Sequence, residues 1–277
     1  MMIHNSIKKI GIIAGQGDLP GLLVTACKKH NIDVFGVVFE GQENQDIINA
    51  ADHICVKLGH AGKAISALKK QNITDIVMIG RIMRPSFSQL IPDAKTAAFL
   101  AKNAFKPLGD DGLLKALRCF LEDEGFTLWG IHTFMPELLT PPGALTKTKP
   151  GKQDEADIHF GANIIRALGA LDIGQSAVIQ DGLVLGVEAI EGTDALINRC
   201  APLKREGRKN SQGVVVKMSK PGQDEDLDLP TCGLKTLENI HKSGYAGIAL
   251  EAGKTLLVHR DDVIAFADQH KLFIVGI

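Results

Sequence analysis

The 277-residue chain has few aromatic residues, almost no net charge and no long apolar run. Aromatic residues make up 5% of it, with one Trp and one Tyr, so it has little surface on which single-stranded nucleic acids can stack. Thirty-one basic and 32 acidic residues leave a net charge of −1, which argues against a large basic footprint for DNA or RNA. We expect no nucleic-acid partner.

Cysteine is also scarce, with five scattered residues. No two of them have the spacing of a zinc site or a redox pair, and we interpret them as reduced cytosolic thiols packed mostly in the core. The apolar runs are shorter than the roughly 18–20 residues of a membrane span. The first residues lack the pattern of a signal peptide. We therefore expect a cytoplasmic protein.

The first half of the chain alternates strand-like and helical stretches. Helical patterns separate five short apolar runs, which lie at residues 10–14, 34–38, 53–58, 76–79 and 126–130. Strands that recur about every 20 residues with helices between them indicate a parallel sheet. We predict an α/β protein with a Rossmann-like N-terminal domain at residues 1–135.

The second half has a different pattern. Residues 136–153 are rich in Pro and Gly, which predicts a linker before a second α/β domain at residues 154–277. Asp181 and Gly182 stand between two apolar runs, and this dipeptide is a strong signal for a β-hairpin. We expect another hairpin around Gly253.

A glycine-rich turn follows the first predicted strand. Gly15, Gly17 and Asp18 precede Pro20 at the start of a helical pattern. Glycines let the backbone approach a phosphate, and the start of a helix offers free N–H groups. The dinucleotide fingerprint has a third glycine where this chain has Pro20. The turn is either a nucleotide or phosphate site or only a tight turn.

Two further loops follow predicted strands of the same sheet. Arg81 and Arg84 come after the fourth strand, where ligands bind in open parallel sheets and guanidinium groups match diphosphate oxygens. The alternative is a solvated basic loop. Asp110 and Asp111 stand in the next loop. They suit ribose hydroxyls or a metal, unless Asp111 caps the following helix.

Carboxylates gather between a strand and a helix in the second half. The candidate residues of this turn are Glu188, Glu191, Gly192, Thr193 and Asp194. Three acids and a free helix start suit a metal or a sugar phosphate, although a capped turn is the simpler interpretation. Lys217 lies in an apolar run, and a buried lysine requires an anionic partner.

The densest polar feature extends from Lys220 to Gly233. Four acids fall within residues 224–228, after Gln223. Asp224, Asp226 and Asp228 alternate, and such oxygen ligands suit Mg²⁺, which joins carboxylates to substrate phosphates. The alternative is a solvated acidic loop.

Five motifs, in order along the chain, make it resemble the LpxI family of UDP-2,3-diacylglucosamine pyrophosphatases. They are GIIAGQGDLPGLL, GRIMRP, GDDGLL, GQSAVIQDGLVLGVEAIEGTDALINR and KPGQDEDLDLPTCGLKTLENIHKSGYAGIALEAG. The chain departs from the family pattern at residues 225–227, which contain no basic residue before Asp228.

The resemblance implies a Mg²⁺-dependent hydrolase that cleaves UDP-2,3-diacylglucosamine to UMP and 2,3-diacylglucosamine 1-phosphate (lipid X) during lipid A synthesis. It implies a Rossmann-like domain and a second α/β domain with the ligand between them. An aspartate matching Asp224 or Asp228 is then essential, and the alignment does not choose between the two.

We assign hypothetical roles on this basis. Asp224 and Asp228 hold Mg²⁺ or orient the attacking water, and Lys217, Lys220 and Arg81 neutralise the diphosphate. The remaining predicted substrate contacts are Gly15, Gly17, Asp18, Asp111, Glu188, Glu191, Gly192, Thr193, Asp194 and Gln223.

Two other functions remain possible at the level of sequence. A non-catalytic sensor of sugar nucleotides or lipids predicts binding without turnover, and a nucleotide-dependent oxidoreductase predicts NAD(P) binding at the first turn. For the hydrolase we expect a homodimer that contacts the cytoplasmic face of the inner membrane transiently.

Overall fold

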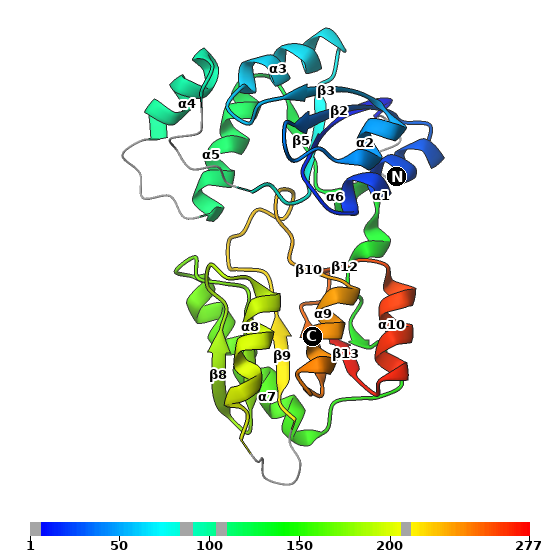
Figure 1. Ribbon diagram of the computed structural model, residues 1–277, viewed down its shortest axis with the longest axis vertical. Helices are drawn as coiled ribbons and strands as arrows, with labels where there is room; N and C mark the ends of the chain where they lie inside the picture. Colours follow the sequence, from blue (N-terminus) through cyan, green and yellow to red (C-terminus); the bar gives the residue numbers. More distant parts are fainter. Residues whose placement is uncertain (1–6, 84–90, 104–109, 206–211) are drawn as a thin grey trace. The chain divides into compact units, whose positions relative to one another are not determined.

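The computed structural model describes residues 7–83, 91–103, 110–205 and 212–277, without the side chains of Asp110 and Asp111. The chain divides into two compact units (Figure 1). Unit 1 comprises Met1–Pro136 and Asp224–Asp228, and unit 2 comprises Glu137–Gln223 and Leu229–Ile277. The short acidic segment therefore belongs to the first unit, although unit 2 flanks it in the sequence.

Unit 1 is built on a five-stranded sheet in the order β3-β2-β1-β4-β5. Its strands are β1 (Lys9–Ala14), β2 (Asp33–Phe39), β3 (Asp52–Val56), β4 (Asp75–Ile79) and β5 (Thr127–Leu128). Every pair of neighbouring strands is parallel. The predicted parallel sheet of an α/β unit is thus confirmed, and each of the five apolar runs contributes a strand.

Helices cover both faces of this sheet (Figure 1). They are α1 (Leu19–Lys29), α2 (Gln45–Ala50), α3 (Ala61–Lys70), α4 (Ala94–Asn103), α5 (Asp110–Asp123) and α6 (Ile131–Phe134). The alternating side chains of β2 show the two layers. Phe35 and Val37 pack with α3 and α5 in one apolar core. Gly36 faces the other layer, because a Cβ on Gly36 would lie 2.3 Å from the side chain of Ile47 in α2.

Unit 2 contains a six-stranded mixed sheet in the order β6-β13-β11-β9-β7-β8. Its strands are β6 (Gly143–Ala144), β7 (Ser176–Gln180), β8 (Leu183–Val187), β9 (Val214–Lys217), β11 (Gly247–Leu250) and β13 (Phe273–Gly276). A separate parallel pair joins β10 (Thr231–Cys232) to β12 (Leu256–Leu257). Because β6 pairs with β13, part of the stretch expected to be a linker forms an edge of this sheet.

The helices of unit 2 also form two layers around the sheet. They are α7 (Lys152–Gly169), α8 (Thr193–Cys200), α9 (Leu234–Lys242) and α10 (Arg260–Gln269), with short 3-10 helices at Pro136–Leu138 and Ala201–Leu203. Helix α7 packs against one face through Ile158, Ala162 and Ile165. The other three helices share a core with Val178 and Val215, which point to the opposite face.

One of the two predicted hairpins is present. Strands β7 and β8 pair antiparallel, and their turn places Asp181 and Gly182 at φ 50° and 75°, as a primed turn requires. The hairpin expected around Gly253 is wrong. Strand β11 instead lies between β9 and β13 and is parallel to both. All four of its residues are buried, which is typical of a central parallel strand rather than of a half-exposed hairpin.

A buried carboxylate fixes the β7–β8 turn. Asp157 of α7 is 1% exposed. Its two oxygens accept hydrogen bonds from the backbone N–H groups of Asp181 and Gly182, both at 2.8 Å. Gln153 donates a third bond at 3.0 Å. The backbone donors of the turn therefore depend on a side chain from a different element.

We predict that Asp157→Ala destabilises the protein by about 3 kcal/mol, because it leaves two backbone donors without their charged acceptor. Denaturant unfolding monitored by circular dichroism measures this change. Gln153→Ala is the matched control, since it removes only one bond to the same carboxylate, and we expect it to cost less than about 1 kcal/mol. Equal effects of the two substitutions would contradict this account of the turn.

The cysteines are all free thiols. Cys27, Cys200 and Cys232 are buried, whereas Cys55 and Cys119 are exposed. Burial raises the pKa of Cys232 to about 12, so this thiol stays protonated and unreactive at neutral pH. Within the described residues, no helix is both long and apolar enough to cross a membrane.

Candidate functional site

The first group of predicted residues lies at the switch point of the unit 1 sheet. Strand β1 is flanked by β2 on one side and β4 on the other. The chain adds β2 and β3 on one side of β1 and then adds β4 and β5 on the other side, so the order of strand addition reverses between β1 and β4. Gly15 and Gly17 follow the carboxyl end of β1, and Arg81 follows that of β4. Ligands of open α/β sheets bind at such a point.

The turn after β1 is tied to its neighbours by backbone bonds. Gln16 and Arg81 exchange hydrogen bonds at 2.8 and 2.9 Å. A Cβ on Gly15 would lie 2.6 Å from the carbonyl carbon of Gly80, so only glycine permits this approach. Asn44, which is 5% exposed, donates to the carbonyls of Gly15 and Gly17 at 3.0 Å each. The turn is therefore held on three sides.

These bonds reduce what the turn offers a phosphate. The N–H of Gly15 already donates to the carbonyl of Ile79, and that of Gln16 donates to the carbonyl of Arg81. Pro20 lies in the first turn of α1 and has no N–H to offer. Gly17 has φ 101° and open space around it. The turn thus keeps a close backbone approach at Gly17 but has fewer donors than a dinucleotide fingerprint provides.

The other predicted residues of unit 1 are only partly described. Arg81 is exposed beside the turn, whereas Arg84 lies outside the described residues. Helix α5 begins at Asp110, so Asp111 lies inside its first turn and is not the helix cap. The side chain of Asp111 is outside the described part of the chain.

The second group of predicted residues gathers at one edge of the unit 2 sheet. Lys217 ends β9 and is paired in register with Ser176 at the start of β7 and with Leu250 at the end of β11. Glu188 follows β8, and its N–H donates to the carbonyl of Ser176 at 2.8 Å. Strand ends that are far apart in the sequence therefore bring their polar residues together.

Four buried side chains form a hydrogen-bonded cluster at this edge: Ser176, Glu188, Thr193 and Lys217, all at most 9% exposed. The Thr193 hydroxyl donates to Glu188 Oε2 at 2.9 Å and accepts from Lys217 Nζ at 2.7 Å. Ser176 Oγ lies 3.1 Å from the same hydroxyl and donates to it, because Thr193 has a single proton. The hydroxyl thus makes every hydrogen bond of which it is capable.

The cluster has an unequal balance of donors and acceptors. An ammonium group has three N–H donors, and Lys217 Nζ makes one hydrogen bond within the described residues, to Thr193. Glu188, the carboxylate of the cluster, is linked to Lys217 through that hydroxyl. A buried cation with donors to spare suits an anionic ligand such as a phosphate.

We predict that Thr193→Val lowers the free energy of unfolding by about 2–3 kcal/mol, since it removes the one hydroxyl that three buried polar groups share. Thr193→Ser keeps the hydroxyl, and we expect it to cost about 1 kcal/mol for the lost methyl group. Chemical denaturation of both variants tests the cluster. A valine variant as stable as the serine variant would show that the shared hydroxyl is unimportant.

Two of the predicted carboxylates have other partners. Glu191 Oε1 accepts from Arg199 Nε and Nη2 at 2.9 and 2.7 Å, and Oε2 accepts from the N–H of Ala189 at 3.1 Å. Backbone N–H groups and the Arg199 guanidinium lower the pKa of Glu191. Asp194 accepts from Thr236 of α9 at 3.1 Å. Glu191 therefore shapes its loop, and Asp194 joins α8 to α9. Gly192 is the N-cap of α8, with φ 82°.

Lys220 and Gln223 belong to the next turn along the chain. Gln223 Oε1 accepts from Ser219 Oγ at 3.0 Å and from the N–H of Lys220 at 2.9 Å. The Lys220 ammonium pairs with Asp172. This turn is ordered by its own side chains up to the residue where the acidic segment begins.

The acidic segment packs within unit 1 and is bound by an arginine of α5. Arg118 Nη2 donates to Asp224 Oδ1 and to Asp226 Oδ2, both at 2.8 Å, and Arg118 Nε lies 2.5 Å from Asp224 Oδ2. Asp226 Oδ1 also accepts from the N–H of Gly130 at 3.1 Å. Burial opposes the charge on Arg118, but the two carboxylates outweigh burial and raise its pKa.

The carboxylates of the acidic segment can hold a Mg²⁺ ion only if the substrate supplies some of the oxygen ligands of the metal. No three His, Cys, Asp or Glu side chains within the described residues are arranged to hold a metal ion. Both oxygens of Asp224 are engaged by Arg118. Mg²⁺ commonly binds through one or two carboxylates together with substrate phosphates and waters, and binding through Asp224 and Asp228 stays a prediction.

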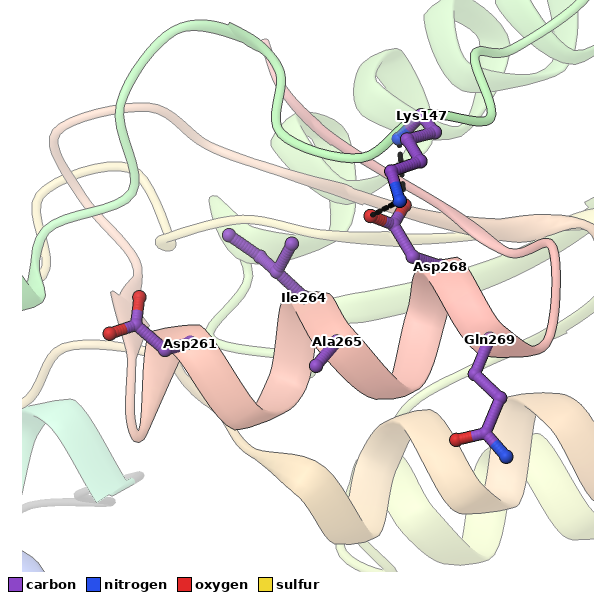
Figure 2. Close-up of a pocket in the computed structure, with 6 residues that line it drawn as sticks. All are labelled: Lys147, Asp261, Ile264, Ala265, Asp268 and Gln269. Carbon is purple, nitrogen blue, oxygen red and sulfur yellow. Dashed lines mark hydrogen bonds and ion pairs between the residues drawn. The ribbon is translucent and has the colours of Figure 1, made fainter.

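A surface groove of about 520 Å³ lies along α10, and none of the predicted site residues lines it (Figure 2). Its lining residues are Lys147, Asp261, Ile264, Ala265, Asp268 and Gln269. Lys147 and Asp268 contact each other through a backbone hydrogen bond of 2.7 Å and an ion pair of 3.9 Å (Figure 2). Because Lys147 and Asp268 compensate each other, neither offers an unpaired charge to a ligand in the groove.

Several residues that organise these sites were not predicted from the sequence. Arg118 holds the acidic segment, and Asn44 holds the turn after β1. Ser176 is a partner of Thr193, and Asp172 is a partner of Lys220. Asn44 precedes a short helix and is its N-cap, so helix-start patterns can find it. Arg118 has no such local signal, because its partners lie 106 and 108 residues away.

The fold and these polar groups define a class of protein. It is a two-unit α/β protein with a Rossmann-type sheet and a buried ammonium group, that of Lys217, which suits an anionic ligand. Models of the LpxI N-terminal and C-terminal domains match residues 9–138 and 141–275. The UDP-2,3-diacylglucosamine pyrophosphatase LpxI of Caulobacter vibrioides is 39% identical over a match of 279 positions that covers 98% of each chain. The chain belongs to the LpxI family.

Solved structures of biotin carboxylases are much more distant. The biotin carboxylase subunit of a pyruvate carboxylase is 13% identical, with 62% of this chain and 34% of that chain covered and a TM-score of 0.27. The biotin carboxylase domain of Hydrogenobacter thermophilus 2-oxoglutarate carboxylase is 15% identical, with 64% and 35% covered and a TM-score of 0.25. These scores are too low to carry an argument.

Proposed function

We propose that this protein hydrolyses the diphosphate of UDP-2,3-diacylglucosamine and releases UMP and 2,3-diacylglucosamine 1-phosphate, as part of lipid A synthesis. The observation that carries the proposal is the 39% identity to the LpxI pyrophosphatase over 98% of both chains. The match spans 98% of both chains, so the activity named for the relative is the guide that we use for this chain.

The chain's own cations support cleavage of a diphosphate. The negative charge of the two phosphates repels the lone pair of an attacking nucleophile, and the transition state gains negative charge on the leaving oxygen. Lys217 provides a buried ammonium with donors to spare. Lys220 lies four residues before Asp224, so the chain itself keeps their Cα atoms within about 14 Å. We assign both lysines to the diphosphate, with Arg81 as a further cation.

Asp224 and Asp228 are the proposed ligands of Mg²⁺ and the groups that orient the attacking water. When bound, Mg²⁺ neutralises phosphate charge and lowers the pKa of water. The carboxylates themselves accept hydrogen bonds from water and fix its lone pair toward phosphorus. In Asp224 the Arg118 guanidinium already fixes the orientation of the carboxylate.

The remaining predicted contacts are proposed to bind the ends of the substrate. Gly15, Gly17 and Asp18 would contact the nucleotide, together with Asp111. The α8 turn would contact the sugar through Glu188, Gly192 and Thr193, with Gln223 beside it. Glu191 and Asp194 act there through the loop and the helix that they hold in place.

Product release by the purified protein tests the proposed function. The protein is incubated with UDP-2,3-diacylglucosamine in detergent micelles, with Mg²⁺ or with EDTA, and UMP is measured by chromatography. We expect release with Mg²⁺ and at least a 100-fold lower rate with EDTA. Tight binding of the substrate without release would favour a sensor. Neither binding nor release would show that this chain acts on another substrate.

The substrate also implies where the protein works. A diacylated sugar nucleotide resides in a bilayer, so we propose that the protein contacts the cytoplasmic face of the inner membrane transiently. We further propose a homodimer, the commonest symmetric assembly. Co-sedimentation with phospholipid vesicles and sedimentation velocity test the two statements separately.

A further inference from the structure

We propose that Arg118 is a positioning residue, which holds the acidic segment 224–228 on unit 1 in the conformation that turnover requires. The proposal rests on the proposed function only in its second half. That the arginine orders the segment follows from contacts within unit 1, and that the ordered segment is needed for hydrolysis follows from the proposed roles of Asp224 and Asp228.

The contacts of Arg118 have the geometry of a clamp. Nη2 donates to Asp224 Oδ1 and Nε forms an ion pair with Asp224 Oδ2, so each oxygen of the carboxylate has its own guanidinium nitrogen. Nη2 also donates to Asp226 Oδ2. A guanidinium that engages both oxygens of a carboxylate fixes the plane of the carboxylate as well as its position. A lysine is a point charge and cannot impose that plane.

Backbone contacts continue the clamp through the segment. Asp224 Oδ1 accepts from the N–H of Asp226 at 3.1 Å, and the Asp224 carbonyl accepts from the N–H groups of Leu227 and Asp228 at 3.1 and 2.9 Å. Leu227 packs against the apolar core of unit 1. Fixing Asp224 therefore fixes the turn that carries Asp228.

The charges of the segment make the arginine necessary. Four carboxylates within five residues repel one another. Arg118 is 22% exposed at its side chain, and its ion pairs with Asp224 and Asp226 are shorter than the 3.9 Å contact of His132 with Asp226. Its other ion pair within the described residues, to Glu122 of the same helix at 3.4 Å, does not involve the segment. The guanidinium thus offsets repulsion that would otherwise open the turn.

The test combines amide hydrogen exchange with kinetics on the full-length protein, in Arg118→Met and Arg118→Lys. Glu122→Gln is the matched control, because it removes a partner of Arg118 without touching the segment. We expect exchange of the amides at 226–228 to rise at least tenfold in the methionine variant, with the sheet amides of β1 unchanged. We expect kcat to fall about 100-fold with KM changed less than threefold. The lysine variant should recover part of both quantities.

Each outcome supports or overturns one half of the proposal. Unchanged exchange at 226–228 in Arg118→Met would overturn the clamp, whatever the activity. Raised exchange with unchanged kcat would overturn the need for an ordered segment. If the wild-type protein has no turnover, the proposed function fails, and the exchange measurement still decides whether Arg118 holds the segment. Raised exchange throughout unit 1 would show a general loss of folding, and would also count against a specific clamp.

Discussion

Asp224→Asn and Asp228→Asn are each expected to lower kcat for UDP-2,3-diacylglucosamine by at least 100-fold. An asparagine keeps the size of the side chain and one acceptor oxygen but loses the negative charge, which both metal binding and water activation require. Groups that stabilise a transition state by charge are commonly worth 10²–10³ in rate. The measurement is the initial rate of UMP release at saturating substrate and Mg²⁺.

The control for these variants lies in the same segment. Glu225 is exposed and stands between two of the aspartates, so Glu225→Gln changes the charge of the segment equally. We expect it to retain at least a third of the wild-type rate. If both asparagine variants stay within tenfold of the wild type, the acidic segment is not the catalytic centre. If Glu225→Gln loses as much of the rate as the two asparagine variants, the effect comes from the net charge of the segment and not from the individual aspartates.

Lys217→Met is expected to lower kcat/KM by 100-fold or more, because the buried ammonium is the cation with spare donors in the hydroxyl cluster. Lys217→Arg keeps the charge but brings a larger, planar group to a position that is 7% exposed, and we expect an intermediate rate. The measurement is the dependence of rate on substrate concentration for each variant.

A second substitution separates catalysis from folding. Removing Lys217 leaves Glu188 as a buried carboxylate with less compensation, which costs stability. Glu188→Gln in the same chain removes that charge while the side chain can still accept from Thr193. We therefore expect the double variant to regain stability without regaining activity. Recovery of turnover in the double variant would show that Lys217 serves only to balance Glu188.

The order of strands and helices was predictable where the apolar pattern is long enough. Each predicted strand of unit 1 is present because its apolar run fits a sheet covered on both faces. The two-residue strands β6 and β10 carry no periodicity that a sequence pattern can reveal. The wrong hairpin at Gly253 has the same origin, since two apolar runs close in sequence do not identify their partners.

The candidate site was predictable only in part. Glu188 and Thr193 were predicted from the acid-rich turn between a strand and a helix, and Lys217 was predicted from its place in an apolar run. Whether a polar side chain faces the edge of the sheet or a neighbouring element was not predictable. Glu191 is therefore held by Arg199 in its own loop, and Asp194 is hydrogen-bonded to Thr236 of α9.

Arg118 illustrates a contact that no local pattern contains. It lies in an amphipathic helix among Leu, Ala and Phe residues, where an arginine ordinarily faces solvent. Its role depends on a segment more than 100 residues later in the chain that leaves unit 2 to pack on unit 1. Contacts of this kind depend on tertiary structure alone.

The most direct test of the central claim is turnover in water enriched with ¹⁸O, followed by mass spectrometry of both products. Hydrolysis of the diphosphate predicts one ¹⁸O atom per cleavage, found in either UMP or the sugar phosphate, and the labelled product identifies the phosphorus that water attacks. Cleavage with neither product labelled would contradict direct attack by water. Intact substrate after prolonged incubation with Mg²⁺ would contradict the hydrolase itself.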